Sequence, residues 1–418
     1  MRGGRGEAID GIYRAEFGRA LATVARLVGD IGLAEDAVHE AFADALRSWP
    51  DRGLPSNPGA WITTAARNRA LDRLRRESAR GAKEQDAVLL TVPNEEPEVT
   101  PVPDDQLRMI FTCCHPALSI ESQVALTLRL VCGLRTIEIA RAFLQPEHTV
   151  AQRLTRAKAK IRAAGIPLRV PPAHLLPERV PAVLACVYLV FTEGYSATSG
   201  STAIRDELCD EAIRLGKLLC ALLPEEPEAR ALLALMLLND SRRGQRRCAD
   251  GELVPIEDQD RTGWNRAEIE SGLRCLISAA ADGVGPYLIQ ARIAAAHATA
   301  RTWAETDWGA IVSAYDELRT HSSSPVIVVN RAIAVGFLHG FGAGLAALDE
   351  VADHPRLAAS HLVPAARADL LRRAGRYAES ATQYRDALGR ASNEQVLQFL
   401  ASRLAQVEAA AEQDITQP

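Results

Sequence analysis

The stretch LRTIEIARAFLQPEHTVAQRLTRAKAKIR, residues 134–162, contains a short apolar segment, a proline-containing turn and a longer amphipathic segment. Proline ends a helix, so the turn from Leu144 to Glu147 separates two helices. In the second segment, apolar side chains recur at helical spacing, at Val150, Leu154, Ala157 and Ile161. The pattern predicts a helix-turn-helix, whose second helix enters the major groove of DNA.

The remaining sequence extends this helical pattern. Ala and Leu recur at helical spacing almost throughout, and strand-like alternation is scarce. The chain has 418 residues, of which 47% are hydrophobic, so it has enough apolar mass for several cores. We therefore predict an all-α protein. Its two small helical domains span residues 1–83 and 107–170 and are joined by a linker at residues 84–106. A helical-repeat domain follows at residues 171–418.

Residues 84–106 separate the two small domains. This segment contains four prolines and seven acidic residues and has no Lys or Arg. Such a composition cannot bury enough apolar surface to fold, so we expect an acidic, flexible linker. Pro171-Pro172 marks the end of the second small domain.

The C-terminal part contains an internal repeat at an offset of 36 residues. Arg331-Ala332 matches Arg367-Ala368, Phe341 matches Tyr377, and Leu348 matches Tyr384. The offset is close to the 34 residues of a tetratricopeptide (TPR) helix pair. We expect a TPR-like helical domain here.

Two helices of the N-terminal part are strongly basic, although the whole chain has a net charge of -5. The first follows Trp61, and a stripe of arginines opposes its apolar face. The second is the last helix of the helix-turn-helix, with His148, Thr149 and Gln152 at its start. A solvated charged face explains one such helix. Two basic helices on either side of an acidic linker favour nucleic-acid binding, because phosphate contacts release counterions.

The sequence contains no catalytic signature such as GxSxG, HExxH or a P-loop, so we expect neither an enzyme nor a cofactor. Cys113-Cys114-His115 lacks the ligand spacing of a zinc site, and we expect no metal. The sequence has no apolar run of 18 residues and no signal peptide, which predicts a cytoplasmic protein with no membrane partner.

Two features of the C-terminal part have no assigned role. The cluster Arg242, Arg243, Arg246 and Arg247 either binds an acidic partner or caps the preceding helix. The segment from Phe191 to Tyr195, with Trp264, Trp303 and Trp308, either lines a pocket or packs in the core.

Three segments together resemble the extracytoplasmic-function (ECF) sigma factors of bacterial RNA polymerase. AEDAVHEAFADALRSW, residues 34–49, is similar to their polymerase-binding helix. WITTAARNRALDRLRRESAR, residues 61–80, is similar to the segment that melts and reads the minus-10 element. Residues 134–162 are similar to their minus-35-reading helix-turn-helix. The long helical C-terminal part resembles the TPR-like extension of one subgroup.

The resemblance implies roles for three sets of residues. The core polymerase-binding set is Glu35, Asp36, His39 and Glu40, which would face outward to the polymerase clamp. The minus-10 set is Arg67, Asn68, Arg69, Arg73 and Arg76. The minus-35 set is His148, Thr149, Gln152, Arg153 and Arg156.

The resulting hypothesis is a transcription initiation factor that binds core RNA polymerase, directs it to promoter DNA and helps open the duplex. Its C-terminal domain would modulate this activity through a regulatory protein or an intramolecular contact. The alternative is a helix-turn-helix regulator that binds DNA without polymerase, with a ligand-sensing helical C-terminal domain. A third hypothesis, an enzyme in residues 173–418, has no candidate residues.

Overall fold

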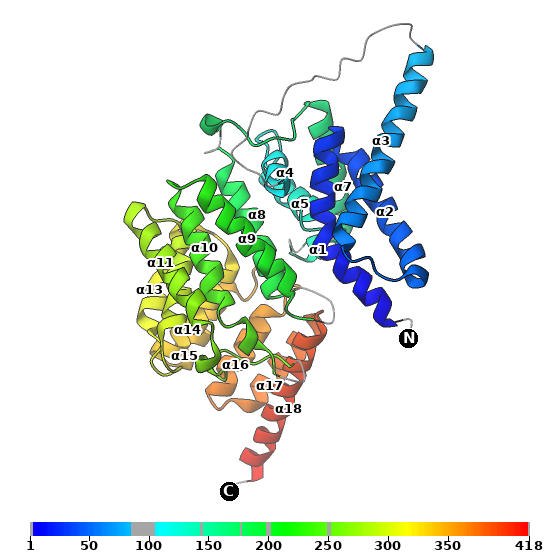
Figure 1. The fold of residues 1–418 in the computed structure, drawn as a ribbon. Helices are drawn as coiled ribbons and strands as arrows, with labels where there is room; N and C mark the ends of the chain where they lie inside the picture. Colours follow the sequence, from blue (N-terminus) through cyan, green and yellow to red (C-terminus); the bar gives the residue numbers. More distant parts are fainter. Residues whose placement is uncertain are drawn as a thin grey trace. The chain divides into compact units, whose positions relative to one another are not determined.

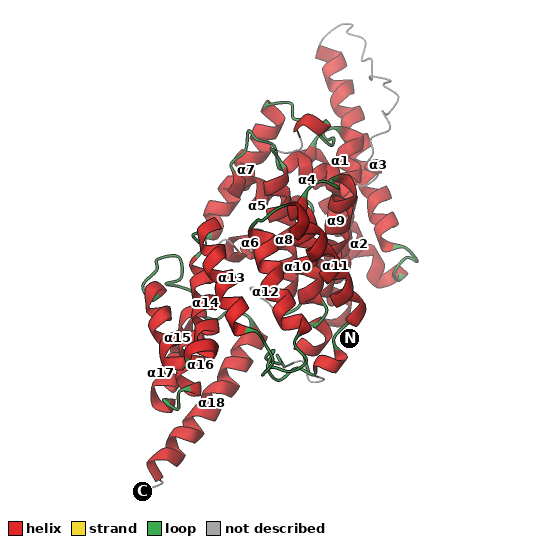
Figure 2. Cartoon of the chain, turned by 90° about the vertical axis from the view of Figure 1, so that its left-hand side faces the viewer, coloured by secondary structure: helices red, strands yellow, loops and turns green. Residues whose placement is uncertain are grey.

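The structure, a computed structural model, describes residues 3–84, 105–142, 145–175, 178–197, 202–248 and 252–416. These residues form helices and loops without a named strand, which confirms the predicted all-α class (Figure 2). A single antiparallel bridge among them pairs Arg247 with Leu253. No helix in these ranges is both long enough and apolar enough to span a membrane. The acidic linker falls almost wholly outside the described residues and stays a prediction.

The chain divides into two compact units, residues 1–190 and 191–418. Unit 1 contains the first seven α-helices, a 3-10 turn and most of α8, which continues into unit 2. Their bounds are α1 (Gly3–Val28), α2 (Ile31–Arg52), α3 (Pro58–Glu84), α4 (Asp105–Cys113), α5 (Ile120–Leu130), α6 (Thr136–Ala142), α7 (Glu147–Ala163), η1 (Ala173–Leu175) and α8 (Val180–Tyr195).

Helices α1, α2 and α3 pack against one another around an apolar stripe of α1. Phe17, Leu21 and Val24 on this stripe are fully buried. Helix α2 is longer than predicted, because it includes Pro50 in its last turn. A proline there removes one hydrogen bond close to the helix end, where the loss matters least. Gly53, with φ of 82°, then ends the helix.

Helices α4 and α5 pack on the other side of α1. The closest approach is at Gly18, where a Cβ atom would lie 1.5 Å from the backbone oxygen of Val131. Gly133 follows with φ of 65° and lies against the ring of Phe17. These contacts hold α4 and α5 directly on α1.

The division between the units lies inside α8, whereas the sequence places the domain boundary at Pro171-Pro172. The reason is that residues before Phe191 pack on α4. The guanidinium of Arg179 donates to the backbone oxygen of Phe111 at 2.9 Å. The sulfur of Cys186 lies 3.9 Å from that of Cys114.

Unit 2 is built from consecutive helices that pack on their neighbours along the chain (Figure 1). The pairs α10 with α11, α14 with α15, and α16 with α17 pack extensively, and α12 packs on both α10 and α13. Their bounds are α9 (Asp206–Leu222), α10 (Pro227–Asp240), η2 (Arg243–Arg246), η3 (Arg261–Gly263), α11 (Arg266–Asp282), α12 (Pro286–Thr299), α13 (Trp308–His321), α14 (Pro325–His339), α15 (Phe341–Leu348), η4 (Asp349–Val351), α16 (Leu362–Arg373), α17 (Tyr377–Arg390) and α18 (Glu394–Thr416).

The sequence repeat corresponds to two of these pairs. Phe341 and Tyr377 are the first residues of α15 and α17. Leu348 and Tyr384 are buried at equivalent places in the two helices. In addition, Arg331 pairs with Asp316 at 2.6 Å, and Arg367 pairs with Asp349 at 2.7 Å. Each pair is therefore joined to the preceding one by an equivalent arginine–aspartate contact.

Substitution of Gly344 by Ala will destabilise unit 2, because its Cβ would lie 2.8 Å from the Cα of Gly336 and 2.9 Å from the backbone oxygen of Ala332. Overpacking of this kind costs about 1–3 kcal/mol. Gly342→Ala on the same helix is the control, since no atom lies within 4 Å of its Cβ position. Chemical denaturation followed by circular dichroism measures both. Equal stability of the two variants would contradict the close α14–α15 packing.

Substitution of Gly18 by Ala will loosen the contact between α1 and the end of α5, since the backbone of Val131 leaves no room for a Cβ atom. We expect faster amide hydrogen exchange in residues 120–134, because local opening precedes exchange. Gly11→Ala, also on α1, is the control, because its Cβ position is open. Unchanged exchange in Gly18→Ala would show that α4 and α5 do not pack on α1 in solution.

Candidate nucleic-acid interface

The predicted polymerase-binding residues lie in the first half of α2. Asp30 caps this helix by accepting a hydrogen bond from the backbone N–H of Leu33 at 2.9 Å. Asp36 and Glu40 lie one turn apart and are exposed, as predicted. His39 is half-buried and Glu35 is buried. The four residues thus form one group along the helix but differ strongly in accessibility.

The exposed acids of α2 pair with the arginine stripe of α3. Arg69 binds Glu40 at 2.9 Å and also contacts Asp44, and Arg73 lies 3.4 Å from Asp36. Exposed ion pairs contribute about 0–1 kcal/mol, so a charged partner can replace them at little cost. The other residues of the predicted minus-10 set, Arg67, Asn68 and Arg76, are exposed.

Glu35 does not face outward, and the expectation that it does is wrong. Its side chain is 8% exposed, with one oxygen 3.3 Å from Arg129 of α5 and the other 2.9 Å from Lys158 of α7. The sequence pattern of α2 gave no sign of this contact, because both cations lie about a hundred residues further along the chain. The helical repeat itself places Glu35 on the buried side of α2, three residues before Val38 and seven before Phe42, and the two cations compensate its charge there.

His39 belongs to the same contact. Its Nε2 lies 3.3 Å from the guanidinium of Arg129 and 3.3 Å from the hydroxyl of Tyr13. Burial, together with the positive charge of Arg129, lowers the pKa of His39. The neutral ring can then accept a hydrogen bond from Arg129. His39 is therefore less available to a partner than its helical position suggested.

Two further ion pairs join the same two groups of helices in unit 1. Arg26 of α1 binds Asp105 of α4 at 2.8 Å, and Thr23 donates to the same carboxylate at 3.1 Å. Arg162 of α7 lies 3.2 Å from Asp30. The hydrogen bonds to Leu33 and Arg162 lower the pKa of Asp30 despite its partial burial. Three sets of contacts therefore hold the basic helix α7 and its neighbours on α1 and α2.

Helices α6 and α7 correspond to the two helices of the predicted helix-turn-helix, and Phe143 and Leu144, between them, lie outside the described residues. The apolar stripe of α7 is buried as predicted, at Val150, Leu154, Ala157 and Ile161. Of the predicted minus-35 set, His148, Gln152 and Arg156 are exposed, while Thr149 and Arg153 are half-buried. Arg156 donates to the Gln152 side chain at 3.0 Å. These side chains lie on one exposed face at the N-terminal end of α7, the end that meets base edges in this motif.

The Cys113-Cys114 pair is buried and serves packing. Cys114 lies against Thr127 and Cys186, and burial raises the pKa of both thiols well above its ordinary value. Among the residues that the structure describes, no three His, Cys, Asp or Glu side chains are grouped to hold a metal ion.

Unit 2 contains a cavity of about 440 Å³ between α9, α10 and α11. Its lining includes Asp210, Arg214, Lys217, Asp240 and Glu268. Burial raises the pKa of Asp240 to about 6, although Arg243 lies 3.2 Å away. The acids and cations of this lining largely offset one another.

Comparison with known proteins relates these segments to families. Residues 12–80 match Sigma-70 region 2, and residues 108–161 match Sigma-70, region 4. Residues 179–280 match a family of unknown function, DUF6596. No solved structure matches.

Relatives of the whole chain and of its N-terminal part are also found. An uncharacterized protein of Rhizobium meliloti is 41% identical over 382 residues, covering 90% of each chain. The probable ECF RNA polymerase sigma factor SigI of Mycobacterium tuberculosis is 28% identical, over 40% of this chain and 59% of that one. The ECF RNA polymerase sigma factor SigK of Mycobacterium ulcerans is 24% identical, over 38% and 86%.

The matched segments coincide with the two groups of helices in unit 1, α1–α3 and α4–α7, that carry the basic faces. The chain belongs to the family of the Rhizobium meliloti protein, and its two Sigma-70 segments make it a sigma factor, a DNA-binding and RNA polymerase-binding protein of transcription initiation.

Proposed function

We propose that this chain is an ECF-type sigma factor that binds core RNA polymerase through α2 and recognises promoters through α3 and α7. The observation that carries the proposal is the exposed row His148, Gln152 and Arg156 at the start of α7, within a chain that has both Sigma-70 segments. Gln and Arg pair bidentately with adenine and guanine. The polymerase supplies the bond-forming chemistry, and unit 2 is a TPR-like regulatory extension.

The minus-10 contact is assigned to α3. Arg67, Asn68 and Arg76 are exposed there, and Arg69 and Arg73 exchange their weak pairs with α2 for phosphates. Asn68 would lie next to an unstacked base of the opened strand. Helices α3 and α7 on one chain would bind the same promoter more tightly than either does alone, because the second contact is intramolecular once the first has formed.

Polymerase binding through α2 competes with the contacts inside unit 1. Glu35 is covered by Arg129 and Lys158, so the polymerase gains this carboxylate only when α5 and α7 leave it. The arrangement of unit 1 in which Arg129 and Lys158 cover Glu35 therefore lowers the affinity for polymerase. Asp36 and Glu40 remain accessible and would make the first contacts.

Replacing Asp36 and Glu40 by Lys will weaken binding to bacterial core RNA polymerase by at least about tenfold, or roughly 1.4 kcal/mol. Charge reversal places like charges opposite the clamp. Asp51→Lys, an exposed acid in the last turn of α2, is the control. Fluorescence anisotropy of the labelled full chain measures affinity. If the wild type does not bind core polymerase, the polymerase-independent DNA-binding regulator becomes the better assignment.

Lys158→Gln will strengthen binding to core polymerase several-fold in the same assay, because it removes one of the two cations that cover Glu35. Lys160→Gln is the matched control, since Lys160 lies exposed on the same helix and has no ion pair among the described residues. Equal affinities for the two variants would contradict competition between α7 and polymerase.

Gln152→Ala and Lys160→Gln will affect promoter binding differently. Loss of a base contact at Gln152 costs about 1–3 kcal/mol and relaxes selection at one base pair of the minus-35 element. Loss of a phosphate contact at Lys160 weakens all sequences alike and reduces the salt slope by about 1. Binding of the polymerase complex to a promoter library at several salt concentrations separates these effects. If the base preference of Gln152→Ala at the minus-35 element equals that of the wild type, Gln152 does not contact a base there.

A further inference from the structure

The loop between α10 and α11, residues 241–265, is held in a compact form. Its two ends are joined by a hydrogen bond from the backbone N–H of Asn265 to the backbone oxygen of Ser241 at 2.7 Å. The turns η2 and η3 lie side by side, and a Cβ at Gly263 would lie 2.4 Å from the side-chain nitrogen of Gln245. The loop thus brings the arginines of η2 next to Arg261 and Trp264.

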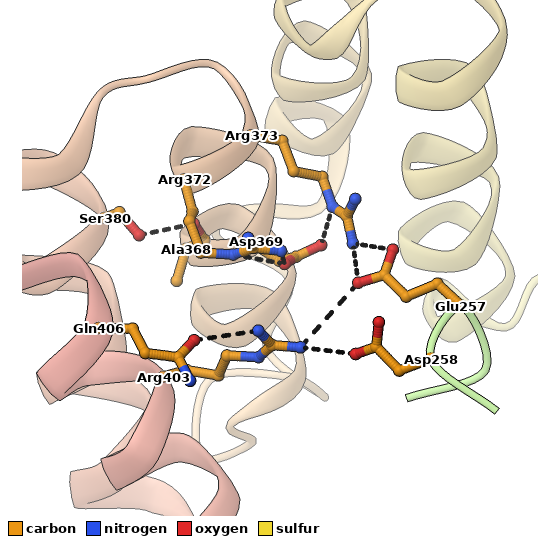
Figure 3. Close-up of polar contacts among 9 residues, drawn as sticks. All are labelled: Glu257, Asp258, Ala368, Asp369, Arg372, Arg373, Ser380, Arg403 and Gln406. Carbon is orange, nitrogen blue, oxygen red and sulfur yellow. Dashed lines mark hydrogen bonds and ion pairs between the residues drawn. The ribbon is translucent and has the colours of Figure 1, made fainter. Parts of the chain in front are cut away.

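The far end of the loop is anchored on the C-terminal helices (Figure 3). The carboxylate of Glu257 binds Arg373 of α16 at 2.5 Å, and Arg373 also binds Asp369 at 2.7 Å. Asp258 lies 3.5 Å from Arg403 of α18. Because these residues are held from both sides, the position of the loop within unit 2 is fixed.

The arginines of the loop fall into two groups. Arg243 binds Asp210 at 2.7 Å and Asp240 at 3.2 Å, and Arg247 binds Asp206 at 3.0 Å. The other group consists of Arg242, Arg246 and Arg261. Among the described residues, none of these three guanidinium groups forms an ion pair with a carboxylate. The loop therefore carries three positive charges that its own acids do not neutralise.

Each of these three arginines, which have no carboxylate partner among the described residues, lies against an aromatic ring. Arg246 and Arg242 lie 3.7 and 5.4 Å from the ring centre of Tyr195, and Arg261 lies 4.7 Å from that of Trp264. Burial, with the charges of Arg246 and Arg261, lowers the pKa of Arg242. The positive charges are thus close enough to repel one another, and cation–π contacts compensate only in part.

Helix capping accounts for part of this arrangement. Arg246 donates to the backbone oxygen of Tyr195 at the end of α8, and Arg261 donates to those of His297 and Ala300 at the end of α12. Arg242 has no polar partner for its guanidinium among the described residues. Capping therefore does not explain the third charge.

Buried polar atoms without a partner lie at the same place. They are the hydroxyl of Tyr195, the indole N–H of Trp264 and one terminal nitrogen of Arg261. Trp264 and Arg261 are 3% and 7% exposed, so bulk water does not satisfy them. An isolated water molecule would satisfy a donor but would leave the positive charge uncompensated.

His297 adds no charge to this cluster. Burial, with the charges of Arg242 and Arg261, lowers its pKa to about 4, so the ring is neutral at physiological pH. The local field therefore comes from the three arginines, offset in part by the negative charge of Glu305 on Arg261, and it attracts an anion.

We propose that Arg242, Arg246 and Arg261 form a binding site for a small ligand that carries a phosphate or carboxylate group. Guanidinium groups bind both oxyanions through paired N–H donors. Arg242, Arg246 and Tyr195 are part-exposed and admit the ligand, while Arg261 and Trp264 supply the buried donors. The buried donors favour a small anionic group over a bulky one. This site is independent of the sigma-factor function.

Isothermal titration calorimetry of the full chain tests the site, with inorganic phosphate in one series and citrate in another, at an ionic strength held constant with chloride. We expect saturable binding of at least one anion, and its identity assigns the class: phosphate alone, carboxylate alone, or oxyanions in general. The absence of saturable binding in both series would overturn the proposal.

Arg242→Gln will weaken the binding at least about tenfold. Arg242→Lys, which keeps the charge, will recover part of it. Arg247→Gln is the matched control on the same loop, since Arg247 is already paired with Asp206, and it will bind like the wild type. Circular dichroism confirms that each variant folds. Equal affinity of Arg242→Gln and wild type would show that the anion binds elsewhere and would overturn the assignment.

Discussion

The arrangement of unit 1 depends on the burial of one carboxylate, that of Glu35. The side chain lies between Arg129 and Lys158, so it joins α2 to both α5 and α7. A buried carboxylate that loses all its cations stays desolvated at a high cost, whereas loss of Lys158 alone leaves Arg129 to compensate the charge of Glu35. The ion pairs of Glu35 therefore add little to the free energy of unfolding, but they favour the arrangement in which α5 and α7 pack on α2. Gly18 and Gly133 allow it, since they let the backbone after α5 approach α1.

Unit 2 uses arginine in a different way. Arg331 and Arg367 join successive helix pairs through Asp316 and Asp349, and these contacts are partly exposed. Individually they contribute little, but their repetition fixes the register of one pair on the next. The loop 241–265 departs from this rule, because three of its arginines lack a carboxylate. The proposed binding site of unit 2 therefore differs from its structural contacts in one property: its arginines have no carboxylate partner among the described residues.

The sequence predicted what local periodicity determines. The stripe Val150, Leu154, Ala157 and Ile161 is buried because the helical repeat alone places it on one face. It also predicted the all-α class of the fold, because apolar residues recur at helical spacing through the chain. Contacts between distant segments could not be predicted in this way. Glu35 lies three residues before Val38 and seven before Phe42, so the helical repeat places it on the buried side of α2 and Asp36 on the exposed side. What the repeat could not predict is that Arg129 and Lys158 would cover this carboxylate.

Glu35 is buried, whereas Asp36 and Glu40 are exposed, so a partner that binds α2 would contact these acids in a fixed order. Asp36 and Glu40 are exposed, and their pairs with Arg73 and Arg69 can exchange with little change in solvation. Glu35 becomes available only after Arg129 and Lys158 withdraw, which breaks the packing of α5 and α7 on this face. A partner therefore gains the outer acids first and the inner acid last. Lys158 lies on the same helix as Gln152, so under the proposed function the release of Glu35 would move the helix that is proposed to read DNA.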